Sequence, residues 1–441
     1  MGRPAVQKLL VSALSELSYT RRHVRFLLGT DAFIPQERRV ALTPDHLCFL
    51  REDLETLGLG ATLAVVKGAG ARTEPPFSDG EFEAVGADLV DVEEAVDLEA
   101  FDVVHALKEP TDYEAELRGP FLRLGALHLA SKPGGVCKMA HQRNFAAILD
   151  GATVGSCSYL LANSDRTPIV AAMSRFAGAV AGKKVVEGLE RNGVDAGTVV
   201  IIGGGIAGRS AIRQVGPKTK KLIVVEPWAP MRARLADFLP GAGFDEFEIV
   251  EALTDEVLDG AVGLVFAHRS GAKAAEKVCH LDQIRRMKKG AAIADIAIDQ
   301  GGSIAHDGYD EHDDAAAARE KYIGLLGQDY AYYAEVNMPR EEPRPASETH
   351  ADAALPYITA LLALCAAHGG PVEAAAAILD RPVRTFNPGD AVVSDFLDAI
   401  LQDLRNGTQI AVIDGEVQVT DPEVEKDEHL VGWLRDCAAG R

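Results

Sequence analysis

The stretch VVIIGGGIAG, residues 199–208, decides the fold of this 441-residue chain. Four consecutive β-branched residues predict a short buried strand, and the residues that follow the stretch have a helical pattern. The glycines fill the G-x-G-x-x-G motif. Gly203 permits a tight turn, Gly205 lets the backbone approach a pyrophosphate, and Gly208 lets the helix pack closely on the strand. Because the start of such a helix also offers free N–H groups to an anion, the stretch predicts a nucleotide-binding turn.

An acidic residue completes this nucleotide-binding pattern. Residues 222–225 (LIVV) predict the next strand, and Glu226 stands at its end, 18 residues beyond the last glycine. A carboxylate there accepts a hydrogen bond from the ribose 2′-hydroxyl and repels a 2′-phosphate, which favours NAD over NADP. A glycine motif by itself is more often a turn without a ligand. Strand, glycines, helix and acid together predict a Rossmann domain that binds NAD, with Ile206 and Ala207 among its cofactor contacts.

Composition and charge narrow the class of protein. The chain has 45 Lys and Arg against 66 Asp and Glu, a net charge of −21, which disfavours binding to nucleic acid or to an anionic membrane. We find no run of about 18 apolar residues and no convincing secretory signal, so we expect a cytoplasmic protein that does not span a membrane. Its six cysteines form no C-x-x-C pair and are expected to be reduced thiols. The acidic, histidine-containing residues 306–314 fit neither an EF-hand nor a zinc motif, so no metal site is predicted.

The rest of the chain predicts a second α/β domain that the Rossmann domain interrupts. From Arg25 onward, short strand-like runs alternate with helical segments, and a long helical stretch follows Pro168. The predicted fold is therefore a doubly wound parallel sheet inserted in a discontinuous, Rossmann-like α/β substrate domain. The predicted parts are an N-terminal extension (1–24), the substrate domain (25–168 and 344–441) and the NAD-binding domain (169–343).

Several local patterns predict individual elements. Leu9, Leu10, Leu14 and Leu17 are expected to share one side of an N-terminal amphipathic helix. Residues 291–298 predict a buried strand, and a long apolar helix is expected to begin after residues 355–357. Alternating apolar residues on either side of Asp414-Gly415 predict a hairpin over residues 410–419.

Several short motifs accompany the nucleotide motif between residues 25 and 360. They are ERRVALTP (37–44), GAG (68–70), FSD (77–79), GA (86–87), LKEP (107–110), LHLA (127–130), DIAIDQGG (295–302), NMP (337–339) and LPY (355–357). In both order and spacing, these segments resemble the alanine dehydrogenase and nicotinamide nucleotide transhydrogenase N-terminal family. Within that family, Lys108 and His128 look like the alanine dehydrogenase branch. A transhydrogenase subunit exchanges a hydride between two nucleotides and needs no amino-acid pocket.

The resemblance implies an NAD-dependent dehydrogenase that interconverts an L-amino acid and its 2-oxo acid plus ammonia. Arg39 would clamp the substrate carboxylate, since a planar guanidinium suits bidentate contact. Lys108 would hold the carboxyl or carbonyl oxygen of the substrate. His128 would transfer a proton, because its unperturbed pKa lies nearest neutrality. Asp299 would act as a base or orient water.

The resemblance also assigns cofactor-side contacts to Ser174, Asn337 and Met338. Each of the assigned side chains has an ordinary structural alternative. Arg39 alone would be read as a surface residue, His128 as a hydrogen-bonded structural residue and Asp299 as a helix cap. Their joint placement within the family pattern favours the functional interpretation. The catalytic cleft is expected between the two domains, whose closure would exclude water. Family relatives are oligomers, so a homo-oligomer, either a dimer or a hexamer, is expected.

Three departures from the family pattern leave the substrate open. Ala126 replaces an aromatic residue, the segment around Ser158 lacks a carboxylate, and residues 345–352 (PASETHAD) replace apolar and hydroxyl side chains with Glu348, His350 and Asp352. A larger or more polar pocket suggests a larger substrate. One alternative is therefore NAD(P)H-dependent reductive joining of an amino-acid amine to a 2-oxo acid, of the opine or carboxyethyl-amino-acid type. Another is a non-catalytic NAD-binding relative.

Overall fold

The computed structural model describes residues 5–31, 33–34, 36–126, 134–151, 169–268, 275–306, 315–381, 396–413, 415–420, 425 and 428–438. The chain divides into two compact units. The Rossmann unit comprises residues 173–341. The discontinuous unit comprises residues 1–172 and 342–441. The sequence places the corresponding boundaries after residues 168 and 343.

The Rossmann unit is built on a parallel sheet of six described strands in the order β14-β12-β10-β7-β8-β9. Numbered along the unit, this is the order 6-5-4-1-2-3 of a doubly wound dinucleotide-binding sheet. Every neighbouring pair is parallel. The central strands are continuous apolar runs, as expected for a sheet covered on both faces. The strands are β7 (Gly197–Ile202), β8 (Thr219–Val225), β9 (Phe247–Val250), β10 (Gly263–Phe266), β12 (Ala292–Asp295) and β14 (Ala331–Tyr333).

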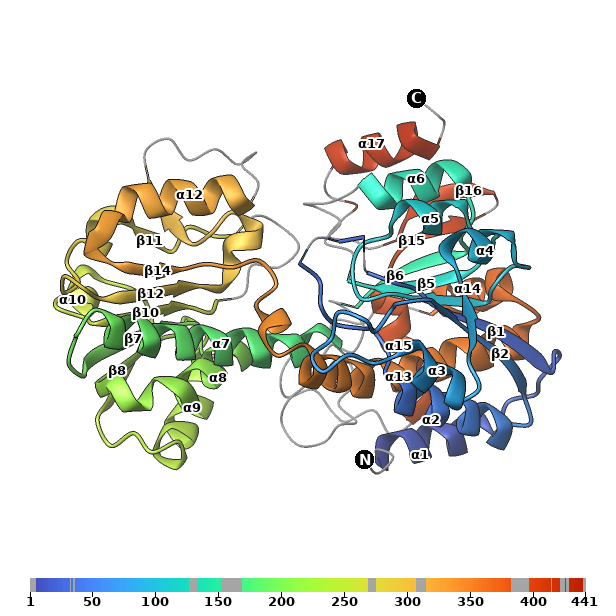
Figure 1. Cartoon of the computed structure of the whole chain (residues 1–441), viewed down its shortest axis with the longest axis horizontal. Helices are drawn as coiled ribbons and strands as arrows, with labels where there is room; N and C mark the ends of the chain where they lie inside the picture. The colour runs from blue at the N-terminus through green and yellow to red at the C-terminus, as the bar shows by residue number, and fades with distance from the viewer. Residues whose placement is uncertain are drawn as a thin grey trace. The chain divides into compact units, whose positions relative to one another are not determined.

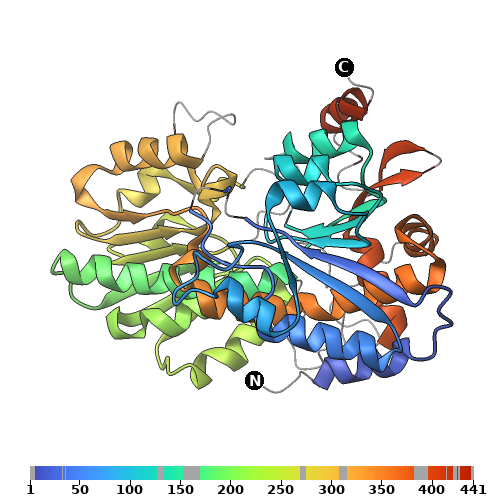
Figure 2. The ribbon, with the colours of Figure 1, turned by 45° about the vertical axis from the view of Figure 1, so that its right-hand side comes forward.

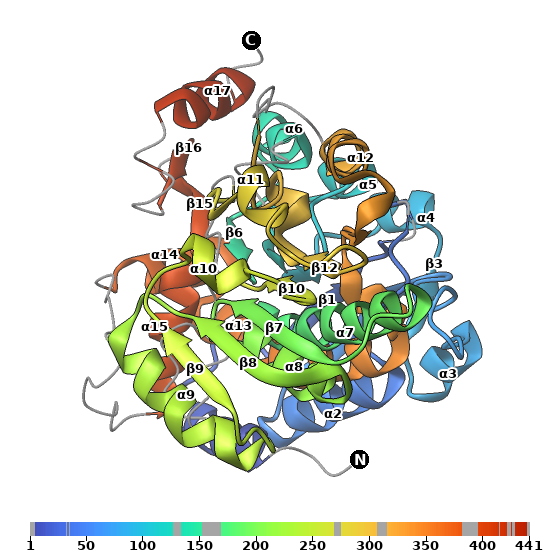
Figure 3. The same ribbon diagram turned by 90° about the vertical axis from the view of Figure 1, so that its left-hand side faces the viewer.

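Helices cover both faces of this sheet (Figures 1 and 3). Side chains of α7, α8 and α9 form one apolar core with one face, and those of α10, α11 and α12 form a second core with the other. A small parallel pair, β11 (Cys279–His280) and β13 (Ile304–Ala305), lies beside the main sheet. The helices are α7 (Ile169–Arg191), α8 (Ile206–Val215), α9 (Ala229–Gly241), α10 (Asp255–Leu258), α11 (Leu281–Ile284) and α12 (Ala315–Leu326), with 3₁₀ turns η1 (Gly216–Lys218), η2 (Ile296–Gln300), η3 (Gly327–Asp329) and η4 (Met338–Glu341).

The discontinuous unit has a second doubly wound sheet, with the strand order β16-β15-β6-β5-β4-β1-β2-β3 among the described residues. The six strands from the first part of the chain are parallel and repeat the order of the Rossmann sheet, and β15 adds to β6 antiparallel. The predicted α/β fold class is therefore confirmed. The strands are β1 (His23–Leu28), β2 (Gly60–Val66), β3 (Asp88–Val90), β4 (Val103–His105), β5 (Leu122–Gly125), β6 (Ala147–Asp150), β15 (Thr408–Ile413) and β16 (Glu416–Val419).

Two apolar cores flank this second sheet. α1, α2, α13, α14 and α15 pack on one face, and α4, α5, α6 and α17 on the other (Figures 1 and 2). α13 is the one described helix long and apolar enough to cross a membrane, but 83% of its most apolar window is buried inside the protein. The helices are α1 (Ala5–Leu14), α2 (Pro44–Thr56), α3 (Asp79–Ala84), α4 (Val92–Asp97), α5 (Asp112–Glu116), α6 (Gly134–Gln142), α13 (Pro343–His368), α14 (Pro371–Leu379), α15 (Phe396–Gly407) and α17 (Glu428–Ala438).

The hairpin prediction is confirmed, since β15 and β16 pair antiparallel with Ile413 opposite Glu416, and Gly415 has a left-handed φ just before β16. Three other local predictions need correction. The strand expected over residues 291–298 ends at Asp295, whose carboxylate accepts the Ala297 N–H and turns the chain into η2. The helix expected after residue 357 begins at Pro343, because a proline suits a first helical turn. In α1, Leu10 and Leu14 are fully buried but Leu9 is 60% exposed.

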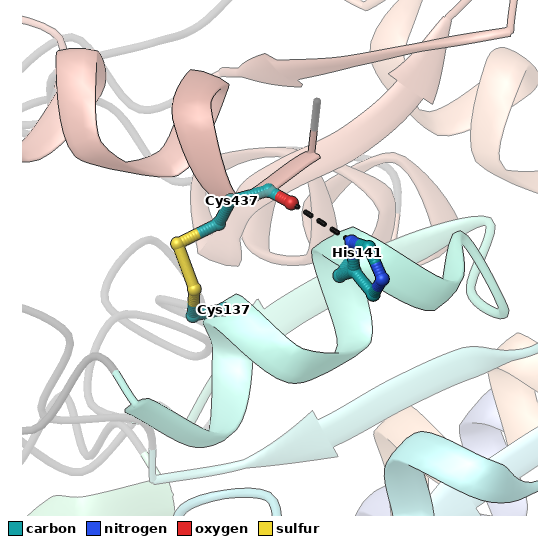
Figure 4. Close-up of a disulfide and its surroundings, with 3 residues drawn as sticks. All are labelled: Cys137, His141 and Cys437. Carbon is teal, nitrogen blue, oxygen red and sulfur yellow. Dashed lines mark hydrogen bonds between the residues drawn. A yellow bond between two sulfur atoms is a disulfide. The ribbon is translucent and has the colours of Figure 1, made fainter. Parts of the chain in front are cut away.

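The cysteine prediction is also wrong for one pair. Cys137 of α6 and Cys437 of α17 form a disulfide, with their Cα atoms 5.5 Å apart, although 300 residues separate them in the sequence (Figure 4). The Nδ1 of His141 lies 3.3 Å from the Cys437 carbonyl oxygen. The packing of the two helices brings the thiols together, and no local sequence pattern predicts such a pair.

Candidate cofactor and substrate sites

The glycine turn follows β7 in the geometry that its motif predicts. Gly203 has a φ of +96°, and a Cβ on it would lie 2.7 Å from the backbone of residues 267 and 268. A Cβ on Gly208 would overlap the carbonyl oxygen of Gly203. By contrast, a Cβ on Gly205 would meet no described atom within 4 Å. Gly205 is also the N-cap of α8 and gives its first turn no side-chain cap. Open space before uncapped helical N–H groups fits a pyrophosphate.

Glu226 lies at the end of β8 and is 9% exposed. Its Oε2 accepts the N–H of Gly204 at 2.8 Å, and its Oε1 accepts that of Trp228 at 2.9 Å. These two bonds hold the carboxylate beside the glycine turn. Each carboxylate oxygen keeps capacity for another donor. The predicted acid is thus ready to accept from a ribose hydroxyl, and the residues present fit NAD.

The other cofactor-side predictions fall on described residues of the Rossmann unit. Ile206 and Ala207 form the first turn of α8, and Ser174 is half-buried in α7. Asn337 has a left-handed φ of +65° before η4. Met338 is 2% exposed and packs in the core beneath α7 and α8, so packing alone accounts for its position. The cofactor contacts of these side chains stay predictions.

In the discontinuous unit, Arg39 is buried and paired with Glu37. The Nε of Arg39 donates to Oε1 of Glu37 and its Nη2 donates to Oε2, both at 2.8 Å. Glu37 also accepts the backbone N–H groups of Arg38 and Arg39. Burial by itself raises the pKa of Glu37, but Arg39 and Lys108 outweigh it and lower that pKa to about 2. A protein carboxylate therefore orients the guanidinium, and both predicted substrate-binding cations act on that same carboxylate.

The main chain of Lys108 is fixed on both sides. Its N–H donates to Asp31 at 3.0 Å, and its carbonyl oxygen accepts from Nη2 of Arg123 at 2.7 Å. Arg123 is fully buried and also pairs with Glu114. Burial, followed by the negative charge of Glu37, raises the pKa of Asp31 to about 7 despite the N–H donors. Sequence reasoning did not find Asp31, because its partners lie more than 75 residues away.

Two buried histidines, His105 of β4 and His350 of α13, stack near this cluster. Their ring centroids are 5.6 Å apart and their planes differ by 4°. The Nδ1 of His105 contacts the carbonyl oxygen of Leu124 at 2.9 Å. Among the described atoms, the remaining ring nitrogen of His105 and both of those of His350 have no hydrogen-bond partner. Burial lowers the pKa of His105 to about 4 and that of His350 well below its usual value, so both rings are neutral at pH 7.

The acids that depart from the family pattern on α13 both have basic neighbours. Glu348 lies 3.6 Å from Nε of Arg344 in the same helix. Asp352 lies 3.0 Å from Nε2 of His46, whose Nδ1 lies 2.6 Å from the hydroxyl of Thr43. Each acid therefore already has a side-chain neighbour, Arg344 for Glu348 and His46 for Asp352.

The remaining predicted site residues are described only in part. His128 and Ser158 lie outside the described residues. Asp299 lies in η2, directly after β12, and only its main chain is described. Ala126 follows β5 and is 9% exposed. Within the described ranges, no group of three or more His, Cys, Asp or Glu side chains is arranged to hold a metal ion.

Comparisons with known proteins identify the family of the chain. The sequence model of the alanine dehydrogenase/PNT N-terminal domain matches residues 33–154, and that of the C-terminal domain matches residues 169–381. Alanine dehydrogenase of Halomonas elongata is 29% identical over 342 residues, which is 74% of this chain and 84% of the relative. The enzyme of Bacillus subtilis is 27% identical over 356 residues, 77% of this chain and 85% of the relative.

Two solved structures show the same fold. An L-alanine dehydrogenase has a TM-score of 0.65 at 20% identity and covers 93% of this chain and 100% of its own. A transhydrogenase from Sinorhizobium meliloti has a TM-score of 0.60 at 16% identity and covers 77% and 95%.

The fold and the glycine turn define a dinucleotide-binding protein with one Rossmann unit and one Rossmann-like unit. The chain belongs to the alanine dehydrogenase/PNT family. It is an NAD-dependent oxidoreductase that acts on CH–NH₂ donors.

Proposed function

We propose that this protein is an alanine-dehydrogenase-like enzyme that interconverts an L-amino acid with its 2-oxo acid and ammonia. One observation carries the proposal: the two cations assigned to the substrate, Arg39 and Lys108, both act on one buried carboxylate, Glu37. An isolated buried arginine would be costly, and a guanidinium that a neighbouring carboxylate holds in one orientation is suited to clamp the carboxylate of a substrate. We also propose that the protein is cytoplasmic and forms a homo-oligomer.

The chemistry divides among the residues as follows. NAD, when bound, accepts the hydride that leaves Cα of the amino acid. Arg39 binds the substrate carboxylate and Lys108 holds its carboxyl or carbonyl oxygen, which keeps Cα in one orientation. His128 moves the proton of the nitrogen or of the attacking water. Asp299 acts as the base or orients that water. Ammonia leaves once water has added to the imine carbon.

The basic neighbours of Glu348 and Asp352 bear on the alternative reaction. Reductive joining with a diamine would need an acid that binds a second ammonium. Because both candidate acids already lie beside a basic side chain, ammonia is the better supported nitrogen donor.

The test is loss of NADH absorbance by the purified protein with a panel of 2-oxo acids. Each acid is offered with ammonia and, separately, with lysine, ornithine and other primary amines. We expect turnover with ammonia. Turnover only with a primary amine would replace this proposal by reductive joining. NADH binding without any turnover would favour a non-catalytic relative.

Two neighbouring arginines provide a matched pair of variants for the clamp. Arg39→Lys keeps a charge beside Glu37 but loses the planar fork, so we expect KM for the 2-oxo acid to rise about 10- to 100-fold. Arg38→Lys, at an arginine that is 41% exposed and pairs with Glu74, should change KM less than about 2-fold. Unchanged NADH binding in both variants would show that the fold is intact. Equal KM values would contradict the clamp.

A further inference from the structure

The turn that carries Asp299 is held near its start and at its end by one buried side chain. β12 ends at Asp295, which is 0% exposed. Its Oδ1 accepts the N–H of Ala297 at 3.0 Å and the hydroxyl of Ser303 at 2.7 Å. Its Oδ2 accepts the N–H of Ser303 at 2.7 Å. Asp295 thus closes a turn over residues 296–303, which we call the Asp299 turn.

A lysine from another segment holds the second half of this turn, after Asp299. The Nζ of Lys277 donates to the carbonyl oxygens of Gly301 and Gly302, both at 2.6 Å, and lies 3.4 Å from the hydroxyl of Tyr322. Both glycines have left-handed φ angles, 92° and 75°. Carbonyls at the end of a helical turn carry partial negative charge, so an ammonium is a favourable partner.

The segment of Lys277 is itself anchored to the turn. The N–H groups of Val278 and Cys279 donate to the carbonyl oxygen of Ser303, and β11 then pairs with β13. Tyr322 of α12 donates to the carbonyl oxygens of Gly301 or Ile304. The lysine therefore has little freedom to move without the turn.

We propose that Lys277 is a positioning residue that acts through Asp299, because its ammonium fixes the Gly301 and Gly302 carbonyls and so the main chain that presents the aspartate. This inference rests on the proposed function, in which Asp299 handles a proton or a water molecule. A displacement of about 1 Å at a reacting group can cost about 100-fold in rate, so a link of this kind has a measurable effect.

The charges around Lys277 predict that kcat depends on pH and falls at alkaline pH. Burial lowers the pKa of Lys277 to about 8, and Asp295 partly opposes this shift. His268, whose own pKa burial lowers, and Glu276 also contribute to this group of charges. Below pH 8 the ammonium holds the turn. Above it the neutral amine is a weaker donor, so the turn loosens and kcat should fall.

The test compares the full-length Lys277→Met and Lys277→Arg proteins with a Lys289→Met control, whose lysine is 82% exposed and lies 3.4 Å from Asp329. For Lys277→Met we expect kcat to fall about 100-fold, the Kd for NADH to stay within about 2-fold, and hydrogen exchange over residues 296–303 to accelerate. Lys277→Arg should retain most of the activity and lose the alkaline decline near pH 8, because a guanidinium stays charged there. Lys289→Met should behave as the wild type.

Combination with Asp299→Asn separates positioning from a general effect on stability. If Lys277 acts through Asp299, Lys277→Met should lower kcat by a much smaller factor in the Asp299→Asn background than in the wild type. An equal fall in kcat in both backgrounds would overturn the inference. It would also be overturned if kcat of Lys277→Arg declined near pH 8 as it does in the wild type.

The hydrogen-exchange measurement also keeps the two proposals distinguishable. If the wild type turns over no substrate of the panel, the proposed function fails. Unchanged exchange of the Asp299 turn in Lys277→Met would overturn the inference whatever the activity. Faster hydrogen exchange of the turn in Lys277→Met would still support the conclusion that Lys277 stabilises the turn.

Discussion

Two buried carboxylates of the discontinuous unit, those of Glu37 and Asp31, have opposite electrostatic surroundings. Glu37 accepts from Arg39, and the pKa of Glu37 is lowered to about 2. Asp31 accepts the backbone N–H groups of Leu107 and Lys108, and burial raises its pKa to about 7. The first carboxylate is therefore charged and orients an arginine. The second gains a proton near neutral pH while it still holds the main chain of Lys108.

The Asp31 carboxyl predicts a pH dependence of folding stability. Its pKa rises from 3.8 in the unfolded chain to about 7 in the fold, so the folded state binds the proton more tightly. Its contribution to stability is fully present below about pH 4 and is lost as the pH rises through 7. The maximal slope is about 1.4 kcal/mol per pH unit. Asp31→Asn, which cannot titrate, should lack this decline.

The measurement is the free energy of unfolding in urea between pH 4 and pH 8 for both proteins. The free energy of unfolding of the wild type, minus that of Asp31→Asn, should fall as the pH rises. Parallel curves over the whole range would contradict a raised pKa for Asp31.

Among the secondary-structure elements, the α6–α17 pair joins distant parts of the chain. A Cβ on Gly135, in the first turn of α6, would overlap the carbonyl oxygen of Pro110, so the helix packs directly on the segment after Lys108. The disulfide between Cys137 and Cys437 fastens α17 to this helix. The C-terminal helix is thus covalently tied to an element next to the candidate substrate residues.

Loss of this disulfide should release α17. We expect Cys437→Ser to accelerate hydrogen exchange of residues 428–438 and to lower stability by about 2–5 kcal/mol, because the open chain gains conformational freedom. Denatured protein prepared without reductant should show at least two fewer reactive thiols than the six of the reduced protein, because Cys137 and Cys437 are bonded to each other. Cys48→Ser, which removes a free thiol, is the control. Six thiols without reductant would contradict the bond.

For the whole molecule, the cofactor site lies in one unit. Ligand that binds only the folded state stabilises it by about 2.7 kcal/mol at 100 times its Kd. We therefore expect NADH to raise the melting temperature and to slow hydrogen exchange over residues 197–226.

Two glycine substitutions in this region provide matched controls. Gly208→Ala should abolish the NADH effect, because its methyl group would overlap the Gly203 carbonyl oxygen. At Gly216, beyond α8, a Cβ meets no described atom within 4 Å, so Gly216→Ala should respond to NADH as the wild type does. NADH stabilisation that survives Gly208→Ala would place the cofactor elsewhere.

The sequence by itself determined the features whose signals are contiguous. The glycine turn, Glu226 at the end of β8 and the hairpin of β15 and β16 each depend on residues that are neighbours in the chain or one element apart. Local steric rules and strand periodicity are sufficient to predict them. The limits of β12 and α13 differ from the predicted ones, because a capping carboxylate ends the strand and a proline in the first helical turn begins the helix.

Only the tertiary structure decided the contacts between distant segments. The stacking of His105 on His350, the bond of Cys137 to Cys437 and the hold of Lys277 on Gly301 join residues that have no shared local pattern. A side chain such as Lys277 looks like an ordinary solvated lysine in the sequence. Its role depends on burial and on carbonyl groups that turn towards it, and both arise only when the sheet and its helices have packed.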